Sequence, residues 1–223
     1  FMCGINGIIS PVQNSELENV ILNMNNSIIH RGPDQDGFFN YENRIFMAMR
    51  RLSIIDLSTG KQPISNDDKS ITIVFNGEIY NYIELRQNLL SMGVTFKTNS
   101  DTEVVLKMYE FYGKEFLKDL DGMFAFSIHD KRSNTVLIAR DYFGEKPLYY
   151  TKTDKLFVWA SELKSIMKSI EKPLIDKQSL NLFLQLTYIP APFTIYENIF
   201  KLEANHYLEF NCDNFTFQIH EID

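Results

Sequence analysis

The feature that most constrains the fold is the arrangement of apolar β-type runs in pairs, with amphipathic helical stretches between the pairs. The pattern predicts two strands joined by a turn at Glu42-Asn43 within residues 37–50, and two more joined by a turn at 130–134 within residues 122–139. Strands joined by such short turns lie antiparallel. Because strands and helices come in separated blocks rather than in strict alternation, we expect mostly antiparallel sheets with helices packed on them, an α+β fold.

The remaining elements follow from periodicity and from helix-start signals. Ser15 with Glu18, and Ser100 with Glu103, have the spacing of capping boxes, and Gly93 ends a helical pattern. The predicted helices cover residues 17–28, 82–92, 101–112, 162–167 and 178–186. The other predicted strands cover residues 4–9, 71–75, 94–96, 148–150, 157–160, 207–211 and 215–220. From Pro190 and Pro192 the composition shifts, so we divide the chain into a domain at 3–188 and a closing β ribbon or junction at 189–223.

Composition excludes several classes of function. A formal net charge of −7 without any Lys/Arg run argues against a nucleic-acid or anionic-membrane surface. The chain shows no signal-peptide pattern and no apolar stretch of membrane-spanning length. Its two cysteines, Cys3 and Cys212, lie at opposite ends with no CxxC or Cys/His cluster, so neither a disulfide framework nor a metal site is indicated. We therefore expect a cytoplasmic setting, and we interpret Cys212 as structural.

Cys3 has a chemical option that few cysteines have. If the residues before it are removed, its own α-amine can act as its general base, because base and nucleophile then share one residue. An α-amine titrates near neutrality, which suits that role. The alternative is that Cys3 is a small buried hydrophobe. Phe1 and Met2 precede it in this sequence, and we expect Phe1 to be foreign to the natural chain, which would begin at Met2.

Three other stretches carry polar groups whose roles stay open at this point. Asn76 and Gly77 follow an apolar strand, where an amide and a backbone N–H could form an oxyanion hole, although Asn-Gly is also a favoured hairpin turn. Arg51 could bind a carboxylate bidentately or lie solvated at a strand end. Asp101, at a predicted helix start, could hold an ammonium group or interact with the helix dipole.

A family resemblance emerges when these motifs are taken together in their order along the chain. The sequence resembles the glutaminase domain of class II glutamine amidotransferases of the asparagine synthetase type, over nearly its whole length. The motifs that carry the resemblance are Cys3-Gly4-Ile5, Arg31-Gly32-Pro33-Asp34, Arg51-Leu52-Ser53-Ile54, Asn76-Gly77-Glu78-Ile79-Tyr80-Asn81, Ser100-Asp101-Thr102-Glu103, and Arg140-Asp141 with Gly144-Glu145-Lys146-Pro147-Leu148-Tyr149.

The resemblance implies a fold and a set of site residues. The fold would be the αββα sandwich of N-terminal nucleophile hydrolases. Cys3 would attack the side-chain amide of L-glutamine to form a thioester, and Asn76 with Gly77 would form the oxyanion hole. The implied substrate-binding residues are Arg51 for the α-carboxylate, Asp101 with Glu78 for the α-ammonium, and the backbone of residues 52–55, including Leu52, Ile54 and Ile55, for the pocket lining. No metal or cofactor is implied for this half-reaction.

The same resemblance implies a partner. Family members carry a synthetase domain that uses ATP and Mg²⁺, and no SGGxDS-like loop occurs here, so we expect a fragment that ends near the domain junction. The ammonia acceptor stays open: aspartate, or a sugar or polysaccharide as in some bacterial members. Another class II amidotransferase, such as the sugar-phosphate aminating kind, is one alternative. A non-catalytic scaffold with this fold is another. A homodimer is possible.

Overall fold

Two antiparallel sheets form the centre of the molecule. The computed structural model describes residues 3–52 and 60–222 of the 223-residue chain. The strands of the first sheet are β1 (Gly4–Ile9), β2 (Gln35–Tyr41), β3 (Ile45–Arg51), β8 (Tyr149–Lys152), β9 (Phe157–Ala160) and β10 (Ile199–Lys201). Those of the second are β4 (Ile64–Ser65), β5 (Ile71–Ile79), β6 (Gly122–Asp130), β7 (Thr135–Arg140), β11 (His206–Asn211) and β12 (Thr216–Glu221).

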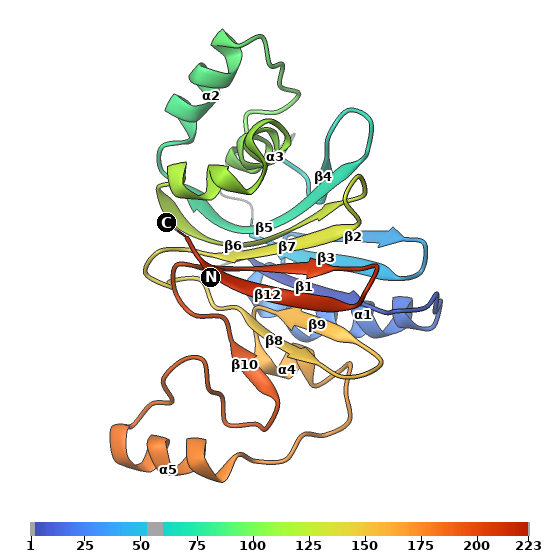
Figure 1. Ribbon diagram of the computed structural model, residues 1–223, viewed down its shortest axis with the longest axis vertical. Coiled ribbons are helices and arrows are strands. Elements are labelled where there is room, and N and C mark those ends of the chain that lie inside the picture. Colours follow the sequence, from blue (N-terminus) through green and yellow to red (C-terminus); the bar gives the residue numbers. More distant parts are fainter. Residues whose placement is uncertain (1–2, 53–59, 223) are drawn as a thin grey trace.

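In both sheets, strands that are far apart in the sequence lie next to each other. The first sheet runs β10-β8-β9-β1-β3-β2 and the second β12-β11-β7-β6-β5-β4. The helices are α1 (Leu17–Ser27), α2 (Tyr82–Ser91), α3 (Asp101–Tyr112), α4 (Leu163–Ile166) and α5 (Lys177–Leu186), with short 3-10 turns η1 (Ile29–Arg31) and η2 (Gly113–Asp119). Figure 1 shows the two sheets stacked face to face, with α2 and α3 outside the second sheet, and α5 apart from the stack at one end.

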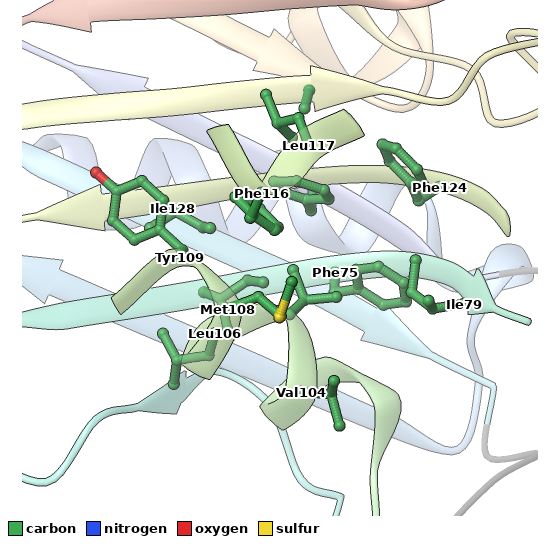
Figure 2. Packing of buried hydrophobic residues seen from close by; sticks show 14 of the residues in the cluster. Phe75, Ile79, Val104, Leu106, Met108, Tyr109, Phe116, Leu117, Phe124 and Ile128 are labelled. Atoms are coloured by element: carbon green, nitrogen blue, oxygen red, sulfur yellow. The ribbon is translucent and has the colours of Figure 1, made fainter. Parts of the chain in front are cut away.

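Three apolar layers hold this stack together, and strand alternation decides which residue enters which layer. On β5, Ile73 and Phe75 face α3, whereas Val74 faces the other sheet. The layer between the sheets includes Trp159 and Phe210, and a third layer packs α1 and α4 on the outer face of the first sheet. Figure 2 shows the layer between α3, η2 and the second sheet. Helices thus cover both outer faces, which confirms the predicted αββα sandwich.

Most predicted elements are confirmed with shifts of a few residues. Glu42 and Asn43 form the β2–β3 turn with positive φ of 53° and 52°, and Gly93 ends the α2 region with φ of 87°. The capping interaction of Ser100 also forms, because its side chain accepts the N–H of Glu103 at 3.2 Å.

Four predictions need correction. No strand forms at 94–96; instead the carboxylate of Glu103 accepts the N–H groups of Lys97 and Thr98 at 2.8 and 2.7 Å, which holds this segment as a connection. At α1, Ser15 bonds Glu18 through its backbone carbonyl, so the expected side-chain cap is absent. Strand β5 continues four residues past the predicted end. Strands β4, within a segment expected to be loop, and β10 were not predicted.

The segment after residue 188 contributes to both sheets. Strand β10 pairs with β8, and β11 pairs with β7. The division at 188–189 stays a prediction, while the strands on its C-terminal side form sheet edges of the sandwich.

Candidate functional site

Cys3 lies immediately before β1, beside the end of β3. Its neighbour Gly4 pairs with Arg50, and this register brings Cys3 next to Leu52, which follows β3. The N–H of Leu52 donates to the sulfur at 3.3 Å, and the thiol lies 3.6 Å from the carbonyl of Leu52. The carbonyl of Cys3 accepts a hydrogen bond from Arg31 Nε at 2.8 Å. Long-range contacts therefore hold both the thiol and the backbone carbonyl of Cys3.

Burial and charge act on this thiol in opposite directions. Burial raises the pKa of Cys3, while the N–H of Leu52 and the positive charges of Arg51 and Lys146 act to lower it. The thiolate is the reactive form of cysteine. The groups around Cys3 thus partly offset the cost of forming that thiolate in a half-buried position.

The edge of β5 that faces away from β6 presents backbone N–H groups to the same region. Phe75 N–H donates to Gln62 Oε1 at 2.7 Å, and Ile79 N–H donates to Asp101 Oδ2 at 3.1 Å. Because N–H directions alternate along a strand, the N–H of Gly77 points to this edge too. A Cβ at Gly77 would lie 2.1 Å from the carbonyl oxygen of Met123, so only glycine fits the close approach of β5 to β6.

Asn76 supplies a second donor. Its side chain lies on the face of β5 that meets the first sheet, and the residue is 1% exposed. Its Nδ2 is buried and has no hydrogen-bond partner among the described residues. Buried amide groups are almost always paired, so an unpaired one calls for an explanation. A developing oxyanion at the adjacent cleft would be a partner for it.

Opposite charges converge on the cleft beside Cys3. Arg51 ends β3 and is 5% exposed, while Asp101 begins α3 and is 6% exposed. Burial raises the pKa of Asp101; the N–H groups of Ile79 and Thr102 oppose that rise, and the charge of Glu78 adds to it. One cation and two carboxylates match the two charged groups of a zwitterionic α-amino acid.

These groups line one cleft of about 480 Å³ that opens to solvent. Its lining consists of Cys3, Arg51, Leu52, Gly60, Gln62, Phe75, Gly77, Glu78, Ser100, Asp101 and Thr102. The predicted pocket residues Ile54 and Ile55 lie outside the described residues, as do Phe1 and Met2. A wider hollow of about 1170 Å³, between the β8–β9 turn and residues 169–174, contains none of the predicted site residues.

Sequence reasoning missed three residues that support the site. Arg31 was part of a motif but had no role, and it holds the carbonyl of Cys3. Gln62 bridges β5 and α3, since its Nε2 donates to Thr102 Oγ1 at 3.3 Å. Lys146 acts on the Cys3 thiol through its charge. Local patterns do not show these roles, because each residue acts on residues far away in the chain.

We also searched the described residues for a metal site and for a membrane-spanning helix. They gather no group of three or more His, Cys, Asp or Glu side chains that could hold a metal ion. None of the helices within 3–52 and 60–222 is long and apolar enough to cross a bilayer.

Comparison with known proteins links this geometry to a family. The sequence profile of the family described as "Glutamine amidotransferase domain" matches residues 2–221. Asparagine synthetase [glutamine-hydrolyzing] 1 of Bacillus subtilis is 45% identical over 205 residues, covering 91% of this chain and 32% of that protein. The putative asparagine synthetase [glutamine-hydrolyzing] 2 of Methanocaldococcus jannaschii is 41% identical, covering 95% of this chain and 44% of its own length. The chain thus spans less than half the length of these relatives.

Solved structures support the fold independently. Glutamine phosphoribosylpyrophosphate amidotransferase from B. subtilis aligns with a TM-score of 0.67 at 20% identity, over 99% of this chain and 49% of that one. A structure described as the allosteric regulatory enzyme of purine biosynthesis aligns with a TM-score of 0.70, also at 20% identity, over 99% of this chain and 49% of its own. At this identity the likeness concerns the fold alone, and it agrees with the two-sheet sandwich.

Proposed function

Because the chain belongs to the glutamine amidotransferase domain family, we propose that its Cys3 cleft hydrolyses L-glutamine to glutamate and ammonia. The observation that carries the proposal is the fully buried Nδ2 of Asn76, which has no hydrogen-bond partner among residues 3–52 and 60–222 and lies beside a cleft that holds a cysteine and charges of both signs. An amide donor that no described residue satisfies suits a charge that exists only during the reaction.

Substrate binding follows from the charges of the cleft. The guanidinium of Arg51 pairs with the α-carboxylate of glutamine, and the carboxylates of Asp101 and Glu78 hold its α-ammonium. These charge-assisted contacts fix the amino-acid end of the substrate. The side-chain amide then reaches the sulfur of Cys3.

The chemistry begins with nucleophilic attack. With Cys3 as the first residue, its α-amine takes the thiol proton, and the sulfur forms a bond to the amide carbon of the substrate. The carbonyl oxygen becomes an oxyanion, which accepts hydrogen bonds from Asn76 Nδ2 and the N–H of Gly77. Asn76 and Gly77 are thus placed to stabilise the tetrahedral intermediate rather than the bound substrate.

The intermediate then collapses in two stages. The carbon–nitrogen bond breaks, the α-ammonium returns a proton to the nitrogen, and ammonia leaves a glutamyl thioester on Cys3. Water, deprotonated by the same amine, attacks the thioester, and the carbon–sulfur bond breaks to release glutamate and the thiol. Protein groups and water suffice for every step, so we propose that this half-reaction needs no metal or cofactor.

The test compares Cys3→Ala with Cys212→Ala in chains that begin at Cys3 or its replacement. We expect Cys3→Ala to abolish glutamate release while leaving the circular dichroism spectrum unchanged. Cys212 is 1% exposed, and burial raises its thiol pKa to about 12, so Cys212→Ala should retain catalysis. A folded Cys3→Ala protein with undiminished glutaminase activity would contradict the proposal.

We further propose that a longer protein uses this ammonia in an ATP- and Mg²⁺-dependent amidation by a second domain, in the cytoplasm, and that it can form a homodimer. The relatives named above are two to three times longer than the matched region, which supports a second domain. The exposed apolar side chains of α5, including Phe183 at 47% and Leu184 at 73%, are suited to contact with another domain. The test is the mass of the natural polypeptide in its source cells: a value near the 26.1 kDa of this chain would contradict a fused second domain.

A further inference from the structure

The backbone of Cys3 is held by a side chain from outside the two sheets. Its carbonyl accepts a hydrogen bond at 2.8 Å from Nε of Arg31, which belongs to the 3-10 turn η1 after α1. The side chain of Arg31 is only 10% exposed. It packs against the first residue of β1, because a Cβ at Gly4 would lie 3.0 Å from Arg31 Cδ and 3.2 Å from Nε. Glycine at this position therefore leaves room for the guanidinium to reach the carbonyl.

A carboxylate holds the other end of this guanidinium. Glu162 Oε1 accepts a hydrogen bond from Arg31 Nη1 at 3.1 Å. The third nitrogen, Nη2, is buried and has no hydrogen-bond partner among residues 3–52 and 60–222. Burying a guanidinium costs free energy, and the bonds to Cys3 and Glu162 offset part of that cost. Because they use two nitrogens of one rigid planar group, they also fix its orientation.

The position of Glu162 is set from β1, the strand that follows Cys3. Glu162 comes directly after Ser161, whose N–H donates to the carbonyl of Ile5 at 2.9 Å. Ser161 Oγ in turn accepts the N–H of Ile5, also at 2.9 Å. Because Ile5 is only two residues from Cys3, these bonds place Glu162 beside the end of β1 that carries the cysteine.

Three side chains converge on the carboxylate of Glu162, and Arg31 links it to Cys3. His30 Nε2 lies 2.8 Å from Oε1 and Lys164 Nζ lies 3.2 Å from Oε2, and both of these side chains are 50% exposed. Although burial acts to raise the pKa of this carboxylate, its three hydrogen bonds lower it. The carboxylate is therefore charged near neutral pH, and Arg31 is its buried partner.

These contacts bear on the α-amine of Cys3. The sulfur is held by the N–H of Leu52 at 3.3 Å, and the carbonyl is held by Arg31. Because Cα is tetrahedral, holding its side chain and its carbonyl fixes the direction of its nitrogen. In a chain that begins at Cys3, no preceding peptide bond holds that nitrogen. The distance between amine and sulfur, on which proton transfer depends, is then set by these two contacts.

We propose that Arg31 and Glu162 are a pair of positioning residues that fixes the α-amine of Cys3 as the general base for its own thiol. Arg31 holds the carbonyl of Cys3, and Glu162 holds Arg31. The inference rests on the proposed function in taking this amine as the base. It requires no contact with glutamine, and neither side chain lines the cleft.

The test observes the Cys3 carbonyl directly, in chains that all begin at Cys3. Cysteine labelled with ¹³C at the carbonyl gives two NMR signals, which Cys212→Ala assigns. The carbonyl of Cys212 accepts from Arg44 Nη2 at 3.0 Å and serves as an internal reference. Because a hydrogen bond draws electron density from a carbonyl carbon, R31M and E162L should shift the Cys3 signal upfield and leave the Cys212 signal in place.

The same variants should slow catalysis without weakening substrate binding. Because a displacement of about 1 Å in a reacting group can cost about 10²-fold, we expect kcat to fall by about 10²-fold in R31M and by about tenfold in E162L. The KM for glutamine should stay within a few fold. E162Q keeps an oxygen that can accept from Arg31, so it should recover most of the activity. K164M, the matched control, removes another contact of Glu162 and should change neither kcat nor the Cys3 signal.

A folded R31M protein with an unshifted Cys3 signal or an unchanged kcat would overturn the proposal. A KM raised as far as kcat is lowered would also contradict it, as would a K164M protein that loses as much activity as E162L. If R31M does not fold, the E162L result decides in its place. The NMR measurement uses no glutamine, so a failure here is distinguishable from a failure of the glutaminase proposal, which the Cys3→Ala assay tests on its own.

Discussion

Truncating Asn76 should separate catalysis from stability, because its amide donor has no hydrogen-bond partner in the part of the chain that the structure describes. In Asn76→Ala the oxyanion keeps only the N–H of Gly77. Loss of one oxyanion-hole donor typically lowers kcat by about 10²–10³. Since the oxyanion exists only in the transition state, the KM for glutamine should change by no more than a few fold.

The expected change in the free energy of unfolding follows from the same buried amide group. An unsatisfied buried polar group costs about 1–3 kcal/mol, which Asn76→Ala removes. The void left by truncation costs up to about 1 kcal/mol, at ~24 cal/mol per Å³ of cavity. The two contributions oppose each other, so the free energy of unfolding should stay within about 1–2 kcal/mol of that of the unmodified chain.

Asn25 provides the matched control. It is 2% exposed, against 1% for Asn76. Its Oδ1 accepts from Asn6 Nδ2 and its Nδ2 donates to the carbonyl of Met49, both at 3.2 Å. Asn25→Ala leaves two buried groups unpaired and should lower the free energy of unfolding by about 2 kcal/mol or more.

The measurements are urea unfolding and steady-state glutamate release on the unmodified chain, Asn76→Ala and Asn25→Ala. The reasoning is refuted if Asn76→Ala keeps kcat within about threefold, the range expected of a group with no transition-state role. It is equally refuted if Asn76→Ala loses as much stability as Asn25→Ala, because Nδ2 of Asn76 would then have a partner in the folded chain.

Two further predictions concern titration. Asp101→Asn should raise the KM for glutamine about 10- to 100-fold, the loss expected for a charge-assisted hydrogen bond, with a smaller effect on kcat. Because the pKa of Asp101 is raised, the KM of the unmodified chain should rise as pH falls toward that value, and a pH-independent KM would count against the ammonium-binding role. Burial lowers the pKa of His129 to about 4 from 6.5, so between these values the unfolded chain binds a proton that the folded chain does not. Stability should therefore fall by about 3 kcal/mol as pH drops through this window. His129→Phe, which keeps the ring packed on Tyr41, should remove that dependence in urea titrations at pH 7, 5 and 4; an unchanged dependence would show that other groups cause it.

Local sequence patterns predicted individual helices and strands better than they predicted how these elements pair and pack. The β2–β3 hairpin follows from alternation and from a turn that tolerates positive φ, so its position was predictable. The predicted strand ends at residue 75, four residues before the end of β5, because Asn76-Gly77 favours a turn locally. Nine cross-strand pairs between β5 and β6 override that preference, and Gly77 allows the close approach.

The functional site was harder still to predict from local patterns, because its residues come from distant parts of the chain. Cys3 could be singled out by its position and by its N-terminal chemistry. Its contact with Leu52 spans 49 residues of sequence, which no periodicity encodes. The roles of Arg51 and Asp101 came with the family resemblance, whereas the hydrogen bond from Arg31 to the carbonyl of Cys3 became visible only in the structure.

The most direct test of the central claim is an acid-quenched intact-mass measurement during glutamine turnover, in a chain that begins at Cys3. The account predicts a transient mass increase of one glutamyl group, mapped to Cys3 by peptide analysis and absent from Cys3→Ala. An actively hydrolysing protein whose glutamyl group maps to another residue, or whose Cys3→Ala variant turns over glutamine equally fast, would contradict it.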